Sequence, residues 1–369
     1  MKRFLTSALC GALLAGGLAT DAPAQAAAAQ AHVAAAKALV APKINNYTIL
    51  KGREDYRNYS NVQEQFCAEP KLPDAVRQDD RGKAPPLKDW YAPPAMIFDN
   101  LYFIGTKGAG VFAVNTSEGI FLIDTNFDYD IKELVQGLLN FGLDPEDIKY
   151  ILISHAHDDR YWGAKTLQDM LPKAHVVMGA ADWDLVAKNN DPARVKPKKD
   201  IAATDGQKFT MGGTTITVYV TPGHTPGALS MIIGPLWNKK SVHPDDTPHF
   251  ASIWPGADIN IGRQGVQYYP DGKTMMQTYV ASMKRFIDLG NKAGVDVVLS
   301  NNNRHANTFE KIRNWRIMNP DESGGGNLDG ILADVMKVEH DPHPFVGKDD
   351  VNRFYGILLE CYEAQLAWR

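Results

Sequence analysis

Residues 151–160, which read ILISHAHDDR, constrain this chain more than any other segment. Three apolar residues, expected to end a buried strand, are followed by His155 and His157 and then by Asp159, each two positions apart. A loop at the end of a strand can aim alternate side chains at one point. Neutral imidazoles and a carboxylate are ligands that Zn²⁺ prefers. The pattern predicts a metal site, and the alternative is that both histidines are satisfied by backbone hydrogen bonds.

A third candidate ligand lies in residues 221–227, which read TPGHTPG. Pro and Gly on both sides predict a rigid turn around the single imidazole of His224. The predicted zinc ligands are therefore His155, His157, His224 and Asp159.

These two motifs resemble the signature of metallo-β-lactamase-fold hydrolases, in which HxHxDH follows a hydrophobic strand and GHTPG comes later. Residues 98–108, 119–125, 147–152 and 181–183 resemble further parts of the same pattern. The likeness is greatest to class B, subclass 3 lactamases and their periplasmic relatives, and it runs from about Pro94 to the end of the sequence. It implies an α/β fold, an αββα four-layer sandwich, with the site in loops along one edge of the sheets.

The order of the elements that the sequence predicts accommodates such a sandwich. Short apolar segments separated by turn residues predict strands at 100–105, 110–115, 119–124, 150–154, 175–178, 214–221, 230–233 and 295–299. Apolar stripes at helical spacing predict helices at 131–141, 164–170, 274–289 and 351–368. The first of these helices is expected to stop at Gly142.

The sequence departs from the resembling family at the second metal site. In that family three histidines hold the first zinc, and an Asp with two histidines holds the second. Arg160 and Asn302 stand where the family has the two remaining histidines. A guanidinium has no lone pair to offer a metal, and an amide oxygen is a weak ligand. One tightly bound zinc ion is therefore predicted.

The resemblance also suggests catalytic roles. A zinc-bound hydroxide is expected to attack a carbonyl-type centre, with Asp159 as general base and proton shuttle. Arg160 is expected to bind a substrate carboxylate or a developing oxyanion, or else to form a salt bridge that only holds the loop. Asn302 is grouped with the substrate-binding residues. Tyr161 and Trp162 are large where the family has small residues, which predicts either a narrower pocket or an aromatic wall on which a substrate can stack.

Other residues near these motifs are weaker candidates. His305 could replace a missing ligand, although a surface histidine is the favoured interpretation. His243 and His249 are expected in a solvated loop. Trp254, Tyr268 and Tyr269 could extend the aromatic wall, with core packing equally plausible for Trp254.

Residues 1–26 have the form of a secretory signal peptide, with a basic start, an apolar run and small residues at 22–26. The apolar run is shorter than the ~18–20 residues that span a membrane, and no other segment is a candidate span. Residues 27–93 are interpreted as an N-terminal tether and extension, with a loose helix or disorder over 27–41, and residues 94–369 as the hydrolase domain. A periplasmic or secreted protein is expected.

After cleavage only Cys67 and Cys361 remain, so one disulfide is possible, and two unpaired thiols are the alternative.

A formal net charge of −4 with mixed signs argues against a nucleic-acid surface and leaves a small-molecule substrate. A lactam, lactone or ester fits the predicted chemistry. In the resembling family the second metal stabilises the leaving nitrogen of a lactam. Without that metal an ester or lactone, whose leaving group needs less stabilisation, is at least as good a candidate. The alternatives are a β-lactamase proper and a secreted binding protein on the same fold. The sequence does not fix the oligomeric state.

Overall fold

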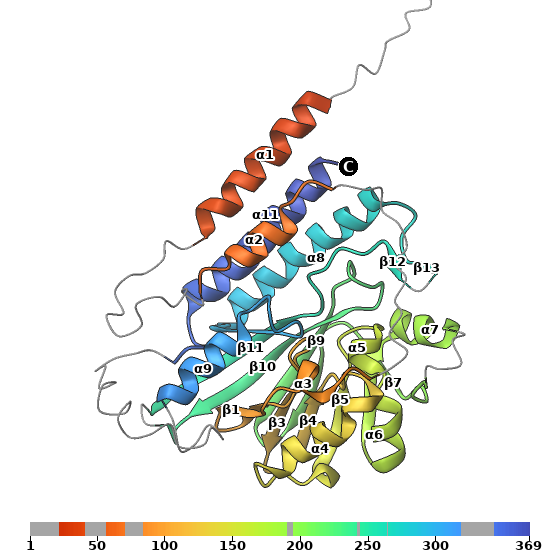
Figure 1. Ribbon diagram of the computed structural model, residues 1–369, viewed down its shortest axis with the longest axis vertical. Coiled ribbons are helices and arrows are strands. Elements are labelled where there is room, and N and C mark those ends of the chain that lie inside the picture. The colour runs from red at the N-terminus through yellow and green to blue at the C-terminus, as the bar shows by residue number, and fades with distance from the viewer. Residues whose placement is uncertain are drawn as a thin grey trace, which may run out of the picture.

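A computed structural model describes residues 22–40, 57–70, 84–189, 195–241, 244–263, 265–318 and 343–369. These residues form two β-sheets packed face to face, with helices against both outer faces (Figure 1). The predicted αββα sandwich is confirmed.

The first sheet has seven strands in chain order, antiparallel from β1 to β4 and parallel from β4 to β7. The strands are β1 (Ala95–Phe98), β2 (Leu101–Phe103), β3 (Phe112–Thr116), β4 (Gly119–Ile123), β5 (Ile148–Leu152), β6 (His175–Gly179) and β7 (Ile201–Ala203). Parallel neighbours need crossover connections. These contain α4 (Ile131–Leu139), α5 (Asp158–Tyr161), α6 (Ala164–Met170) and α7 (Ala180–Lys188), with single 3₁₀ turns η1 (Asp128–Asp130) and η2 (Pro145–Asp147).

The second sheet has five strands in the order β14-β11-β10-β9-β8. They are β8 (Gln207–Met211), β9 (Thr214–Val220), β10 (Leu229–Asn238), β11 (Asp245–Trp254) and β14 (Val297–Ser300). Its outer face carries α8 (Gly272–Ala293) and α11 (Lys348–Ala367), and a separate ribbon pairs β12 (Gly262–Arg263) with β13 (Val266–Gln267). The remaining helices are α1 (Ala22–Leu39), α2 (Ser60–Phe66), α3 (Leu87–Trp90) and α9 (Thr308–Met318).

Strand β4 shows how the layers are built. Phe121 and Ile123 point into the core between the sheets, whereas Ile120 and Leu122 pack under α4. Side chains alternate across a strand, so a strand buried on both faces reads as a continuous apolar run. Because β4 and β5 pair in parallel, their C-terminal ends, and therefore the loop after β5, lie at one edge of the sheet.

Strand β11 was not predicted, and the sequence explains why. Its first half lies in the Pro- and Asp-rich stretch that was interpreted as a solvated loop. Pairing with β10 nevertheless extends it to Asp245, with register shifts that accommodate the irregular residues. The expectation of a solvated His249 is therefore wrong: it is buried, with Nδ1 2.7 Å from Asp296 Oδ2 and Nε2 3.2 Å from Asp245 Oδ2. His243 lies outside the described residues.

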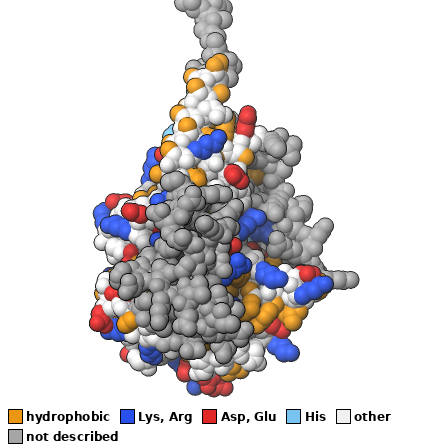
Figure 2. All heavy atoms as spheres, turned by 60° about the vertical axis from the view of Figure 1, so that its left-hand side comes forward, with side chains coloured by type: hydrophobic (Ala, Val, Ile, Leu, Met, Phe, Trp, Pro, Cys, Tyr) orange, Lys and Arg blue, Asp and Glu red, His pale blue; other side chains and the backbone are white. Residues whose placement is uncertain are grey.

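The Ala-rich segment near the N-terminus forms helix α1, which packs along α11. Ala29 and Ala36 are buried in that contact, and His32 Nδ1 lies 2.7 Å from Glu360 Oε2. Figure 2 shows α1 standing out from the body of the protein. Of the predicted signal peptide, residues 1–21 lie outside the described residues. Among the helices that are described, none has the length and apolarity that a membrane crossing requires.

Candidate metal centre

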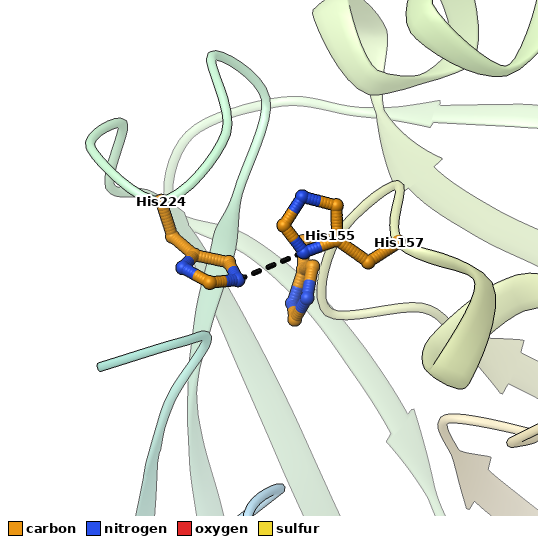
Figure 3. A group of neighbouring side chains, drawn as sticks. All are labelled: His155, His157 and His224. Carbon is orange, nitrogen blue, oxygen red and sulfur yellow. Dashed lines mark hydrogen bonds between the residues drawn. The ribbon is translucent and has the colours of Figure 1, made fainter. Parts of the chain in front are cut away.

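The three predicted histidine ligands converge at the edge of the sheets (Figure 3). His155 and His157 lie in the loop that follows β5, and His224 lies in the loop between β9 and β10. One ring nitrogen from each lies within 4.8 Å of the others, and all three side chains are buried. The ring centroids are 4.7, 4.4 and 4.6 Å apart for the pairs 155–157, 155–224 and 157–224.

A hydrogen bond at Nδ1 fixes the orientation of the His224 ring. Its Nδ1 lies 2.7 Å from the Asp258 carbonyl oxygen, to which the Tyr279 hydroxyl also donates at 2.6 Å. Donation from Nδ1–H leaves the lone pair of Nε2 directed at the cluster, where His157 Nδ1 is 3.0 Å away. A Cβ on Gly256 would stand 2.3 Å from the ring, so glycine at this position makes room for the imidazole.

Asp182, in the first turn of α7, ties the two histidine loops together. Its carboxylate accepts hydrogen bonds from Ala156 N at 2.8 Å in one loop, and from Thr225 Oγ1 at 2.6 Å and Gly227 N at 2.7 Å in the other. Burial raises the pKa of Asp182 to about 6, although the three donors oppose that shift. Gly227 permits the approach, because a Cβ there would lie 2.4 Å from Asp182 N.

A second buried carboxylate braces the loop from the other side. Asp124 accepts from Ser154 N at 2.7 Å and from Ser154 Oγ at 2.8 Å, directly before His155. Asn301 Nδ2 donates to the same hydroxyl at 3.1 Å. Burial raises the pKa of Asp124 to about 6, and the Arg160 guanidinium opposes this shift. The ligand loop is thus fixed by groups that do not face the metal position.

The electrostatics of the cluster suit a cation. Burial lowers the pKa of His155 and His157 well below the usual range and that of His224 to about 4, and the guanidinium groups of Arg160 and Arg263 add to the shift. The imidazoles are therefore neutral near pH 7, which is the form that binds metal. His157 Nε2 has no hydrogen-bond partner among the described residues. Three neutral imidazoles meet the ligand requirement of a zinc site with an open fourth position.

Asp159 does not join the three-histidine cluster but lines the same cavity. Its Oδ2 lies 3.1 Å from Arg160 Nη2, and its Oδ1 lies 3.8 Å from Arg263 Nη1. The carboxylate therefore sits between two guanidinium groups beside the metal position. The sequence indicated Arg160 here but not Arg263.

Arg160 is buried, and its terminal nitrogens already bind protein oxygens. Nη1 donates to Asn301 O at 2.5 Å, and Nη2 donates to Asn302 Oδ1 at 2.7 Å in addition to its contact with Asp159. Asn302 Nδ2 in turn donates to Asp258 Oδ2 at 3.2 Å. Both residues line the cavity, and the contacts of Arg160 with Asp159, Asn301 and Asn302 agree with the alternative expectation, a salt bridge that holds the loop.

The cavity in front of these groups has a volume of about 600 Å³. Its aromatic wall is made of Trp90 from α3 with Phe127 and Tyr129, whose rings stack at 5.1 Å. Tyr161 and Trp162, expected in this wall, do not line the cavity. The Tyr161 ring packs under the first sheet, and Trp162 is 9% exposed behind Phe127. The expectation fails because both follow the ligand loop inside a helical turn that directs them inward.

Other candidates are also placed differently from the simplest expectation. His305 is buried rather than on the surface; it packs against Phe66 at 5.1 Å and does not join the ligand cluster. Trp254 and Tyr269 belong to the core under α8. Tyr268 alone comes near the centre, with its ring 6.0 Å from that of His157.

Three residues that line the cavity were not predicted, because no sequence motif marks them. Asp258 and Arg263 lie in the Gly-flanked stretch between β11 and α8, and single charged residues in such loops are usually solvated. Trp90 lies in the N-terminal extension, far from the motifs in sequence. Its neighbours Asp89 and Tyr91 gave it the appearance of an ordinary polar linker.

Residues 108–234 match the model of the Metallo-beta-lactamase superfamily. The chain contains a metallo-beta-lactamase superfamily domain. The matched segment holds all three histidines, Asp159 and Arg160.

Curated relatives of this metallo-beta-lactamase domain include hydrolases. The chain is 32% identical over 114 residues to a metallo-beta-lactamase type 2 of Bacillus cereus, covering 30% of this chain and 41% of that protein. It is 30% identical over 87 residues to a hydroxyacylglutathione hydrolase of Acidiphilium cryptum, covering 24% of this chain and 31% of that protein. These matches span less than two thirds of the length of either relative.

Solved structures share the fold of the domain over most of their length. The subclass B3 metallo-beta-lactamase BJP-1 of Bradyrhizobium japonicum superposes with a TM-score of 0.55 and 25% identity, covering 75% of this chain and 94% of that chain. A Cronobacter sakazakii metallo-beta-lactamase described by its HARLDQ motif superposes with a TM-score of 0.58 and 21% identity. That match covers 81% of this chain and 98% of that chain.

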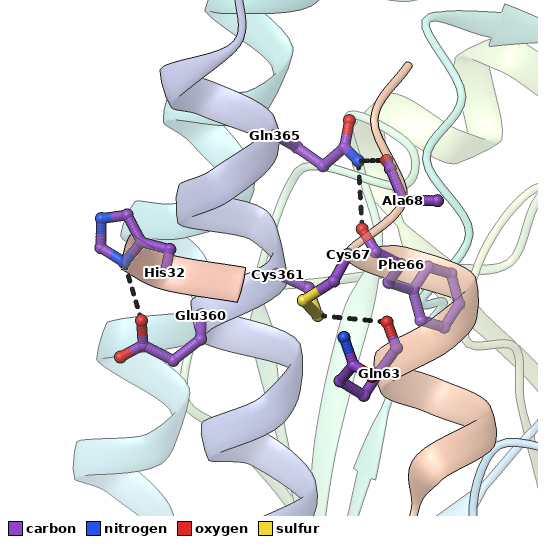
Figure 4. The surroundings of a disulfide bond; sticks show 8 residues. All are labelled: His32, Gln63, Phe66, Cys67, Ala68, Glu360, Cys361 and Gln365. Carbon is purple, nitrogen blue, oxygen red and sulfur yellow. Dashed lines mark hydrogen bonds and ion pairs between the residues drawn. A yellow bond between two sulfur atoms is a disulfide. The ribbon is translucent and has the colours of Figure 1, made fainter. Parts of the chain in front are cut away.

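A disulfide joins the end of α2 in the N-terminal segment to α11 (Figure 4). Cys67 and Cys361 are bonded, with Cα atoms 4.5 Å apart, so the predicted pairing is confirmed. Gln365 Nε2 donates to the carbonyl oxygens of Phe66 at 3.1 Å and Ala68 at 2.6 Å. Gln65 Nε2 from the same segment donates to Asp258 Oδ1 at 2.9 Å, next to the carbonyl that orients His224.

Removing this disulfide should destabilise the protein. Replacing Cys67 and Cys361 with serine should lower the free energy of unfolding by about 2–5 kcal/mol, because a loop closed between distant parts of the chain restricts the unfolded state. Urea unfolding in oxidising buffer measures this, and dithiothreitol should destabilise the wild type but not the double variant. Equal stability of the wild type with and without reductant would contradict the expectation.

Proposed function

We propose that this protein is a zinc-dependent hydrolase of a small molecule with a carbonyl-type centre. The observation that carries the proposal is the convergence of three buried, neutral imidazoles on one side of a cavity of about 600 Å³. A zinc ion held there would act as a Lewis acid and bring the pKa of water near neutrality. The chain's own residues then position the substrate and move the protons.

Asp159 is the proposed proton carrier. Its carboxylate faces the same cavity as the histidines without belonging to their cluster, and the side chain is only 16% exposed. Contacts with Arg160 and Arg263 hold it in place. It would accept the proton of the attacking water and return it to the leaving group, which is the work of a positioned general base and acid.

The two arginines favour a single zinc ion and shape the choice of substrate. The guanidinium of Arg160 is fixed by Asn301 and Asn302 on the side where the resembling family holds its second metal. With Arg263 it provides positive charge that stabilises an oxyanion or an anionic leaving group. An ester or lactone releases an oxygen anion, whereas a lactam releases a poorer nitrogen leaving group. Esters and lactones are therefore proposed ahead of lactams.

β-Lactams are the second candidate class, because the relatives and neighbours with this fold include proteins named as metallo-beta-lactamases. A panel of aryl esters, lactones and β-lactams, assayed together with zinc content, tests the proposal. About one zinc per chain with turnover of one class supports it. Zinc without turnover of any panel member would instead point to a binding protein on the same fold.

We further propose that the protein acts in the periplasm or outside the cell. Residues 1–26 have the composition of an export signal. The Cys67–Cys361 disulfide supports this, because structural disulfides persist mainly in oxidising compartments. Fractionation of the producing bacterium tests the location.

Replacing Asp159 with asparagine separates its proposed role from metal binding. The change keeps the shape of the side chain but removes the proton acceptor, so kcat should fall by about 10²–10⁴-fold while zinc content stays near that of the wild type. Asp246→Asn, at a fully exposed position, is the matched control. If zinc is lost together with activity in Asp159→Asn, the carboxylate is a metal ligand rather than a proton carrier.

A further inference from the structure

A second, much smaller cavity lies behind the aromatic wall of the active-site cavity. It has a volume of about 10 Å³, enough for one water-sized particle. Asn126, Asp130 and Glu133 line it, and we call this space the Asp130 chamber. Trp90 and Thr106 line both the chamber and the large cavity, so the two spaces share a wall.

Asp130 is an unusual residue to bury here. It is 2% exposed and precedes the first turn of α4, yet its side chain does not cap that helix. Neither carboxylate oxygen has a hydrogen-bond partner among the described residues. Burial raises the pKa of Asp130 well above its usual range. The backbone N–H groups of Phe127 and Asp130 oppose the shift, and Glu133 and Asp128 add to it.

Asn126 presents a second unpartnered oxygen to the same chamber. Its side chain is 1% exposed, and Oδ1 has no hydrogen-bond partner in the described part of the chain. Buried polar atoms without partners are costly, and in native proteins they usually indicate a bound ion or water. Two carboxylates and an amide oxygen around one small space carry more negative charge than a water molecule would compensate.

The ligand atoms define the class of ion. They are all oxygens, which favour hard cations over zinc or copper. Mg²⁺ demands near-ideal octahedral geometry, which side chains from one short stretch of chain do not readily supply. Ca²⁺ accepts irregular sets of carboxylate and amide oxygens. We propose that the Asp130 chamber binds one calcium ion through Asp130, Glu133 and Asn126.

The position of this ion gives it a structural connection to the active site. Asp130 ends the turn η1, which also carries Tyr129 of the aromatic wall. The Tyr129 ring meets that of Trp90 from α3 edge-to-face at 5.4 Å. An ion between η1 and α4, beside Trp90, therefore fixes the wall from behind. The calcium site is independent of the proposed hydrolase function.

Calorimetric titration of CaCl₂ into the zinc-loaded, full-length protein tests the proposal. One calcium per chain is expected, with unchanged zinc content, because three imidazoles are poor ligands for calcium. Asp130→Asn should weaken calcium binding at least about tenfold by removing one anionic ligand, and Glu133→Gln should also weaken it. Asp246→Asn makes the same charge change at an exposed strand position and should bind calcium like the wild type. MgCl₂ should bind more weakly than CaCl₂.

Terbium luminescence then locates the ion. Tb³⁺ takes calcium sites and is excited by a nearby indole, so its emission should fall in Trp90→Phe while that variant still binds calcium. Absence of calcium binding to the wild type, or wild-type affinity in Asp130→Asn, would overturn the proposal. Full terbium emission in Trp90→Phe would place the ion elsewhere and overturn it as well.

Discussion

Replacing His157 with alanine should remove zinc from the purified protein and abolish hydrolysis. His157 supplies the nitrogen that lies 3.0 Å from His224 Nε2, so its loss leaves two imidazoles and a buried gap where three converge. Without a metal the pKa of the attacking water is no longer lowered toward neutrality, and a rate loss of at least roughly 10³-fold is expected. Zinc content by mass spectrometry and initial rates on the most active substrate measure both effects.

The control for this variant is a histidine that carries no ligand role. His175 begins β6, and its side chain is 55% exposed, so His175→Ala removes an imidazole without touching the cluster. It should retain wild-type zinc content and rate. Apo His157→Ala should melt below apo wild type, because the change leaves a buried cavity and removes the contact of Nδ1 with His224 Nε2, so zinc content is compared in folded protein only. Retention of zinc and turnover by His157→Ala would contradict the metal assignment.

The ligand cluster could be predicted from sequence because its information is local. His155 and His157 are spaced to leave one strand end together, and His224 is fixed by the prolines and glycines around it. The order of strands and helices was predictable for a similar reason, since each element depends on a run or stripe of apolar residues, and the family resemblance implied the sandwich. What holds the ligands was not predictable. Asp182 lies in residues 181–183, which resemble the family pattern, but its sequence neighbours do not show that it accepts hydrogen bonds from both histidine loops.

The errors share a physical cause. Tyr161 and Trp162 were placed in the pocket because they adjoin the motif, but a helical turn after His157 rotates them into the core. His249 and strand β11 were missed because pairing with β10 supplies hydrogen bonds that a single sequence does not display. Trp90 reaches the cavity from about 65 positions before His155, through tertiary packing alone. Whether a residue lines the cavity therefore depends on the direction of the helix or strand that carries it more than on its distance in sequence from the motif.

Replacing both Arg160 and Asn302 with histidine should create a second zinc site. The double change returns two neutral imidazoles beside Asp159 and removes the guanidinium that now contacts it at 3.1 Å. A unit charge about 5 Å from Zn²⁺ repels it by roughly 7 kcal/mol at an effective dielectric near 20, which strongly weakens binding of the ion. Zinc stoichiometry should rise from about one to about two per chain, measured after dialysis against a weak chelator.

The variant Arg160→Lys with Asn302→His separates charge from ligand supply. It keeps a cation beside Asp159 while adding one imidazole, and it should remain a one-zinc protein. Arg160→His alone should bind the second zinc weakly, because Asn302 then offers only its amide oxygen and Arg263 still lies 3.8 Å from Asp159. If the wild type itself binds two zinc ions tightly, the guanidinium does not stand in for a metal. The second ion must then take ligands other than Arg160 and Asn302, and His305, buried but outside the histidine cluster, is the first residue to test.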